Sequence, residues 1–112
     1  MRHYKLRFKT ISKFRYEELL SFCRQYHEKK VLLHNKGENG IVSVSLTRIE
    51  RDIKLIDECA SMVQDGILKD ELLKNVCYGI KVNELNLSPE KKSKFNKART
   101  YFFELLDMKK CG

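Results

Sequence analysis

The sequence predicts a single α+β domain in which a small, mainly antiparallel sheet of three or four strands packs on helices. Three observations support this prediction: apolar and polar side chains alternate near the N-terminus, a turn-rich segment separates two β-rich runs, and several stretches carry apolar residues at helical spacing. The chain has 112 residues, 42% of them apolar, which suffices for one modest core. We therefore expect one domain over residues 1–112.

The first strand is predicted from Arg2 to Thr10, where side chains alternate strictly between two faces. One face is apolar, with Tyr4, Leu6 and Phe8, and the other carries His3, Lys5, Arg7 and Lys9. A helix should follow from Ser12 to about Glu28, because Ser12 is a good N-cap and Ile11 can pack on Tyr16. Its apolar face comprises Leu19, Leu20, Phe22, Cys23, Tyr26 and His27.

A hairpin is predicted next, from the β-rich runs 31–34 and 41–46, because the Asn and Gly residues between them suit a turn with positive φ. Thr47 and Glu50 form a capping box, so a second helix should begin there and end at Asp65-Gly66. Its apolar positions are Ile49, Ile53, Ile56, Ala60 and Val63.

The C-terminal part predicts a short helix over 70–76, a strand over 77–85 and a long last helix. Ser88 and Pro89 mark the start of that helix, which should reach about Lys109. Its apolar face comprises Phe95, Ala98, Phe102, Leu105 and Leu106. The order of elements matches a ferredoxin-like split β-α-β domain with an extra C-terminal helix. A three-stranded sheet with a helical C-terminal half is the alternative.

The net charge of +8 is unevenly distributed along the chain. Residues 1–30 carry nine Lys or Arg against three acids, residues 31–88 carry seven against nine, and residues 89–112 carry seven against three. Basic ends predict a strongly anionic partner, most often a nucleic acid and less often an acidic protein or a membrane surface. No run of apolar residues exceeds three, which argues against a membrane span and a signal peptide. We expect a cytoplasmic protein.

The basic face of the first strand is the first candidate for nucleic-acid binding. Side chains two apart on a strand lie about 6.6 Å from each other on one face, so a row of this kind can follow a phosphate backbone. The candidate residues are Arg2, His3, Lys5, Arg7, Lys9, Lys13 and Arg15. A solvated edge strand that uses lysine against aggregation is the alternative.

The last helix is the second candidate. Lys91, Lys94 and Lys97, with Lys92 and Arg99, lie beside Tyr101 and Phe103, and such mixtures occur in proteins that bind single-stranded nucleic acid. At Tyr101 and Phe103 themselves we favour a protein interface, with a partner protein or a second copy of the chain, because apolar residues spread over more than half of the helix.

Signals for metal or cofactor chemistry are weak. Cys23 and His27 are four residues apart, but two ligands do not make a site and the chain has no Cys-x-x-Cys pair. The four cysteines, Cys23, Cys59, Cys77 and Cys111, are widely scattered and predict reduced cytosolic thiols rather than a disulfide framework. We expect no metal and no cofactor.

Signatures of catalysis are also missing from the sequence, including a phosphate-binding glycine loop, a nucleophile elbow and His-Glu-x-x-His. The first hypothesis is therefore a small non-enzymatic regulatory protein that binds RNA or single strands. The second is an inhibitor, encoded for instance by a phage or mobile element, that blocks a nucleic-acid-binding protein or binds an acidic partner. The third is a small metal-independent ribonuclease using Arg7, His34 and Tyr78.

Overall fold

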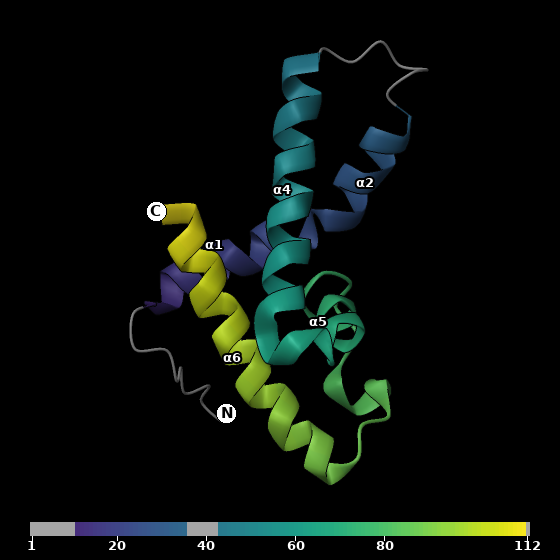
Figure 1. Cartoon of the computed structure of the whole chain (residues 1–112), viewed down its shortest axis with the longest axis vertical. Helices are drawn as coiled ribbons and strands as arrows, with labels where there is room; N and C mark the ends of the chain where they lie inside the picture. Colours follow the sequence, from purple (N-terminus) through teal and green to yellow (C-terminus); the bar gives the residue numbers. More distant parts are fainter. Residues whose placement is uncertain (1–10, 36–42, 112) are drawn as a thin grey trace.

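A computed structural model describes residues 11–35 and 43–111, and every regular element in these ranges is a helix (Figure 1). The elements are α1 (Lys13–Arg24), α2 (Tyr26–His34), α4 (Ser43–Met62), η1 (Val63–Gly66), α5 (Lys69–Val76), η2 (Val82–Leu85) and α6 (Pro89–Cys111). The described ranges contain no strand. The predictions of an α+β class and of a ferredoxin-like sheet are therefore wrong. The predicted strand over 2–10 lies outside the described residues.

Helix α1 begins where the sequence predicts. The Ser12 hydroxyl accepts a hydrogen bond from the Arg15 amide at 3.1 Å, and both Ile11 and Tyr16 are buried. The helical path bends at Gln25, whose backbone (φ −89°, ψ 0°) separates α1 from α2. The single helix predicted to end near Glu28 is thus two helices, of which the second continues to His34.

The predicted hairpin is wrong, because residues 31–34 form the end of α2 and residues 43–46 form the start of α4. β-Branched residues favour strands only weakly, and packing of α2 against α4 overrides that preference. Ile41 and Val42 lie outside the described residues. Helix α4 also begins four residues before Thr47, so the Thr47–Glu50 pair lies inside the helix and does not start it.

The apolar face of α4 is as predicted. Ile53, Ile56, Ala60 and Val63 are buried and Ile49 is half-buried, as expected for apolar residues at helical spacing. The helix gives way to η1 at Val63, where Gln64 and Asp65 adopt positive φ.

Helix α5 agrees with the short helix predicted over 70–76. The strand predicted over 77–85 is wrong: Gly79 has a φ of +74° and Val82–Leu85 is a 3-10 turn. A lone strand is not stable, and the described parts of the other predicted strands, residues 31–34 and 43–46, are helical. Local bonds satisfy the backbone instead, since the Ile80 amide donates to the Lys74 carbonyl at 3.0 Å and the Asn75 side chain donates to the Ile80 carbonyl at 2.9 Å.

Helix α6 confirms the predicted last helix and extends it to Cys111. The Ser88 hydroxyl accepts from the Lys91 amide at 3.2 Å, and Pro89 occupies the first helical position. All five predicted apolar positions are buried, namely Phe95, Ala98, Phe102, Leu105 and Leu106.

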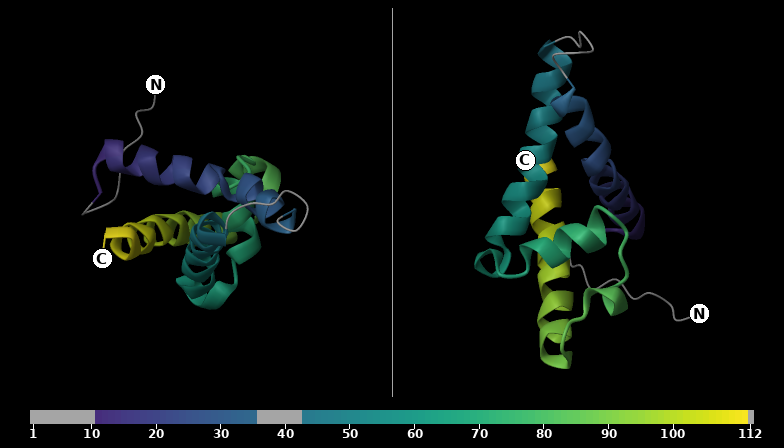
Figure 2. Two further views of the ribbon diagram at one scale, coloured as in Figure 1. Left: turned by 90° about the horizontal axis from the view of Figure 1, so that it is seen from above. Right: turned by 90° about the vertical axis from the view of Figure 1, so that its right-hand side faces the viewer.

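The core lies where α6 crosses α4, with α1 and α5 packed on α6 as well (Figure 1). Helix α2 runs beside the other end of α4, away from α6 (Figure 2). The N-terminal half of α6, drawn in green in Figure 1, extends beyond the point where α6 crosses α4. This half carries most of the lysines of the helix.

Candidate nucleic-acid interface

The N-terminal half of α6 presents three exposed lysines, Lys91, Lys94 and Lys97, which we call the α6 lysine row. They follow one another at three-residue intervals, so successive ammonium groups lie on neighbouring turns of the helix. Residues 89–99 contain a single acid, Glu90. The α6 lysine row is therefore a strongly positive strip at the surface.

The lysines of this row form no ion pair with the described residues. Lys91, in the first turn of α6, also lies at the positive end of the helix dipole, where a cation lowers rather than raises helix stability. Neither ion pairing nor interaction with the helix dipole explains the row. Its charge is available to an anionic ligand.

Tyr101 extends the row. It lies four residues beyond Lys97 and seven beyond Lys94, and 52% of its surface is exposed. The sequence predicts Tyr101 beside these lysines and favours a protein interface there; its exposed side chain lies on the same side of the helix as Lys94 and Lys97. The sequence spacing identifies this position of Tyr101. Residues 94, 97 and 101 recur at helical spacing, each one residue before the buried positions 95, 98 and 102.

Phe103, expected at a protein interface, is fully buried within this chain. Its ring makes edge-to-face contacts with Tyr16 at 5.0 Å and with Phe102 at 5.2 Å between centroids. Arg99 is also directed inward, because its Nε donates to Asn75 Oδ1 at 2.7 Å and its guanidinium lies 5.0 Å from the Phe103 ring. Neither side chain belongs to the exposed strip.

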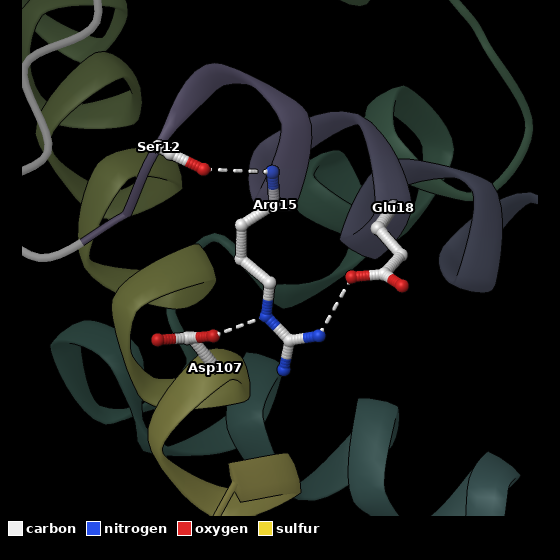
Figure 3. A network of polar contacts seen from close by, with 4 residues as sticks. All are labelled: Ser12, Arg15, Glu18 and Asp107. Carbon is white, nitrogen blue, oxygen red and sulfur yellow. Dashed lines mark hydrogen bonds and ion pairs between the residues drawn. The ribbon is translucent and has the colours of Figure 1, made fainter.

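Arg15, expected to contact nucleic acid, lies in an ion-pair network between α1 and α6 (Figure 3). Its Nε is 2.5 Å from Asp107 Oδ1, and its Nη1 is 2.8 Å from Glu18 Oε1. Lys13, by contrast, is exposed. The remaining N-terminal candidates, Arg2, His3, Lys5, Arg7 and Lys9, lie outside the described residues.

A shallow hollow of about 330 Å³ on α4 is the next candidate for a binding surface. It is lined by Thr47, Glu50, Arg51, Lys54, Leu55 and Glu58. Basic and acidic side chains are mixed here, and Lys54 lies four residues from Glu50 and four from Glu58. This mixed lining suits an anion less well than the α6 lysine row.

Cys23, Cys59 and Cys77 are free and buried. A hydrogen bond with the Cys77 thiol and burial both raise the pKa of Cys23, and burial raises the pKa of Cys59 to about 11. Thiols of this kind are poor nucleophiles. His27 is exposed, and no group of three His, Cys, Asp or Glu side chains within the described ranges could hold a metal ion.

His34 and Tyr78, two of the three residues of the ribonuclease hypothesis, are both exposed. Tyr78 contacts the rings of Tyr26 and His27, whereas no ring contact or hydrogen bond joins it to His34 within the described part of the chain. Arg7, the third residue, lies outside that part. The described residues thus do not assemble the three groups.

Comparison of the chain with protein-family models, curated proteins and solved structures finds no match. None of the described helices has both the length and the apolar content needed to cross a membrane. A function for this protein is therefore inferred from the surface chemistry of its helices.

Proposed function

We propose that this protein binds nucleic acid through the α6 lysine row and acts without catalysis, as a small regulatory protein. One observation carries the proposal: Lys91, Lys94 and Lys97 are exposed on neighbouring turns, form no ion pair with the described residues and have one acid nearby in the sequence. Ammonium groups in such a row bind phosphates and release counterions. Contacts of this kind give affinity with little sequence specificity.

RNA or single-stranded DNA is the proposed ligand class, because Tyr101 adds an exposed ring to the row. Unpaired bases can stack on such a ring, whereas the bases of a duplex are already stacked on one another. The N-terminal residues Arg2, His3, Lys5, Arg7 and Lys9 are proposed to contribute further phosphate contacts, and they remain a prediction from sequence.

Replacing Lys91, Lys94 and Lys97 together with alanine tests the proposal. Each phosphate contact on a single strand contributes about 0.7 to the slope of log affinity against log salt, so loss of three contacts should flatten the slope by about 2. Fluorescence anisotropy of a labelled single strand, titrated at several salt concentrations, measures it. Stability should hold, because surface substitutions usually change it by about 0.5 kcal/mol or less.

A matched control is available on α4. Arg48, Arg51 and Lys54 are exposed, have the same three-residue spacing and carry the same total charge. Their triple alanine variant should retain most of the salt slope, because acids surround them. If the salt slope flattened equally in both variants, the effect would come from net charge and not from the α6 lysine row. If the unaltered protein showed no salt-sensitive binding to RNA or DNA, the proposal would be refuted.

A protein partner on the C-terminal half of α6 is a second candidate function, covering both an inhibitor and a homodimer. Its support is the exposure of Tyr101 and Met108 (52% and 62%), which lie seven residues apart and so share one face. Met108→Glu separates the two proposals. It should disrupt a protein complex or a dimer, as measured by light scattering, and leave nucleic-acid affinity unchanged.

A cytoplasmic location completes the proposal. Its support is that Cys23, Cys59 and Cys77 are free thiols in a fold of this size. Small secreted domains usually use their cysteines in disulfides instead.

A further inference from the structure

A second basic surface joins the end of α1, the start of α2 and the loop after α5. Arg24 and His27 are three residues apart across the bend at Gln25, and Lys30 follows three residues later. Tyr78, from the loop after α5, contacts His27, with 5.7 Å between the ring centroids. All four side chains are exposed. We call this set the Arg24–Tyr78 surface.

Within the described part of the chain, the Arg24 guanidinium is bonded to the protein through only one of its three nitrogens. Its Nε donates to the Val76 carbonyl at 2.8 Å, which fixes the side chain at the end of α5. Its two terminal nitrogens form no hydrogen bond or ion pair with the described residues. Arginine nitrogens in this state can bind a phosphate.

Gly79 keeps this guanidinium accessible. A Cβ at residue 79 would lie 3.4 Å from Arg24 Nη1, and the φ of Gly79 is +74°. Another residue would be strained at this positive φ, and its Cβ would be in van der Waals contact with the guanidinium. Glycine therefore leaves this side of the guanidinium uncovered.

Tyr78 presents an accessible ring that packs edge-on against Tyr26 and His27. It is 47% exposed and makes an edge-to-face contact with Tyr26 at 6.2 Å between centroids. Tyr26 is itself fixed, since its hydroxyl donates to Asp57 Oδ1 at 2.6 Å, and the Lys30 ammonium lies 5.1 Å from the Tyr26 ring. Burial and this bond to Asp57 raise the pKa of Tyr26, because both favour the neutral hydroxyl that donates to Asp57.

The local charge favours an anion. Segment 24–30 has three basic side chains against one acid, Glu28, and the Asp57 carboxylate is already bound to the Tyr26 hydroxyl. Lys29 forms an ion pair with Asp52 at 2.9 Å, which leaves Arg24 and Lys30 as the cations that face a ligand.

We propose that the Arg24–Tyr78 surface binds one unpaired nucleotide of a single-stranded nucleic acid, with the base stacked on Tyr78 and the adjoining phosphate on Arg24 and Lys30. The inference rests on the proposed function and deepens it, because it selects single strands over duplexes. A base within a duplex offers no free face to Tyr78, whereas an unpaired base does.

The test compares the affinity of a single-stranded oligonucleotide containing 2-aminopurine with that of a duplex of the same length. Tyr78→Ala and Tyr78→Leu should each weaken single-strand binding about 5- to 150-fold and reduce the stacking quench of the 2-aminopurine, while Tyr78→Phe should retain both. Duplex affinity and the salt slope should change little in all three variants, because no phosphate contact is removed.

Phe14→Ala is the matched control, since this ring on α1 is 79% exposed and lies outside both basic surfaces. Circular dichroism of each variant checks folding, and Tyr78→Leu keeps an apolar side chain at the position. Single-strand binding that Tyr78→Ala and Tyr78→Leu leave intact would overturn this inference. If the α6 triple variant still lost salt-dependent binding, the proposed function would stand without it. Failure of the unaltered protein to bind any nucleic acid would overturn both.

Discussion

Arg15, Arg24 and Arg99 each bond to a group on another helix: Asp107, the Val76 carbonyl and Asn75, respectively. A planar guanidinium with five N–H groups can hold such a contact in fixed geometry, whereas a lysine ammonium is flexible and strongly hydrated. The lysines of the α6 lysine row accordingly remain at the surface. Part of the positive charge therefore serves the fold, and part remains exposed at the surface.

The Arg15–Asp107 pair should contribute measurably to stability. Only 26% of the Arg15 side chain and 17% of the Asp107 side chain are exposed, so solvent screens the pair incompletely. A double-mutant cycle with Arg15→Gln and Asp107→Asn, followed by urea unfolding, should give a coupling free energy of about 1 kcal/mol. Glu18, with 69% of its side chain exposed, is the control, and Glu18→Gln should change stability by less than about 0.5 kcal/mol. A coupling near zero would contradict the structural role given to Arg15.

Cys59 should make stability sensitive to alkaline pH. Burial raises its pKa from 9.0 to about 11, so the thiol ionises in the unfolded chain before it ionises in the folded one. The stabilising contribution is complete below pH about 9 and is lost as the pH rises through about 11, by up to about 1.4 kcal/mol per pH unit.

Urea unfolding at pH 8 and pH 10.5 measures the effect, and Cys59→Ala should reduce the difference between them. Some difference should persist, since the pKa values of Cys23 and Tyr26 are raised as well. An identical pH dependence in the variant would show that the Cys59 thiol does not titrate as described.

At the scale of an element, α6 has a buried apolar face and, next to it, an exposed face that carries the α6 lysine row. Phe102 is fully buried, whereas the neighbouring Tyr101 is 52% exposed beside the lysines. Phe102→Ala should lower the free energy of unfolding by about 3–5 kcal/mol, because it leaves a cavity in the core. Tyr101→Ala should cost less than about 1 kcal/mol and lower nucleic-acid affinity instead. Thermal unfolding measures the stability of the two variants, and fluorescence anisotropy measures their nucleic-acid affinity. A large loss of stability in Tyr101→Ala, or none in Phe102→Ala, would show that the faces are assigned wrongly.

The break between α1 and α2 also matters at this scale. Tyr26 is buried after the bend at Gln25, while Arg24 and His27 are exposed on either side of it. The sequence predicts the apolar position of Tyr26 but does not indicate that the loop after α5 brings Tyr78 to the same surface. The Arg24–Tyr78 surface therefore depends on the tertiary position of that loop and on the turn at Gly79.

Across the whole molecule, most local signals were reliable, with the Thr47–Glu50 capping box as an exception, and pairing signals were not. The caps at Ser12 and Ser88 and the apolar face of α6 were predicted correctly, because they depend on residues within a few positions of one another. The lysines of α6 were predicted as a candidate for the same reason. Phe103 and Arg15 were assigned to surfaces because sequence does not show which neighbour a side chain meets.

The sequence by itself determined the basic ends of the chain, the start of three helices and the composition of the apolar faces, all through short-range spacing and charge. Only the tertiary structure decided whether short β-rich runs would pair. A strand is stable only with a partner, and packing of α2 and α4 against each other gives residues 31–34 and 43–46 a helical alternative. The tertiary structure also decided which basic side chains are bonded within the protein. Arg15 bonds to Asp107, Arg99 to Asn75 and Arg24 to the Val76 carbonyl, and each of these partners comes from a distant part of the chain.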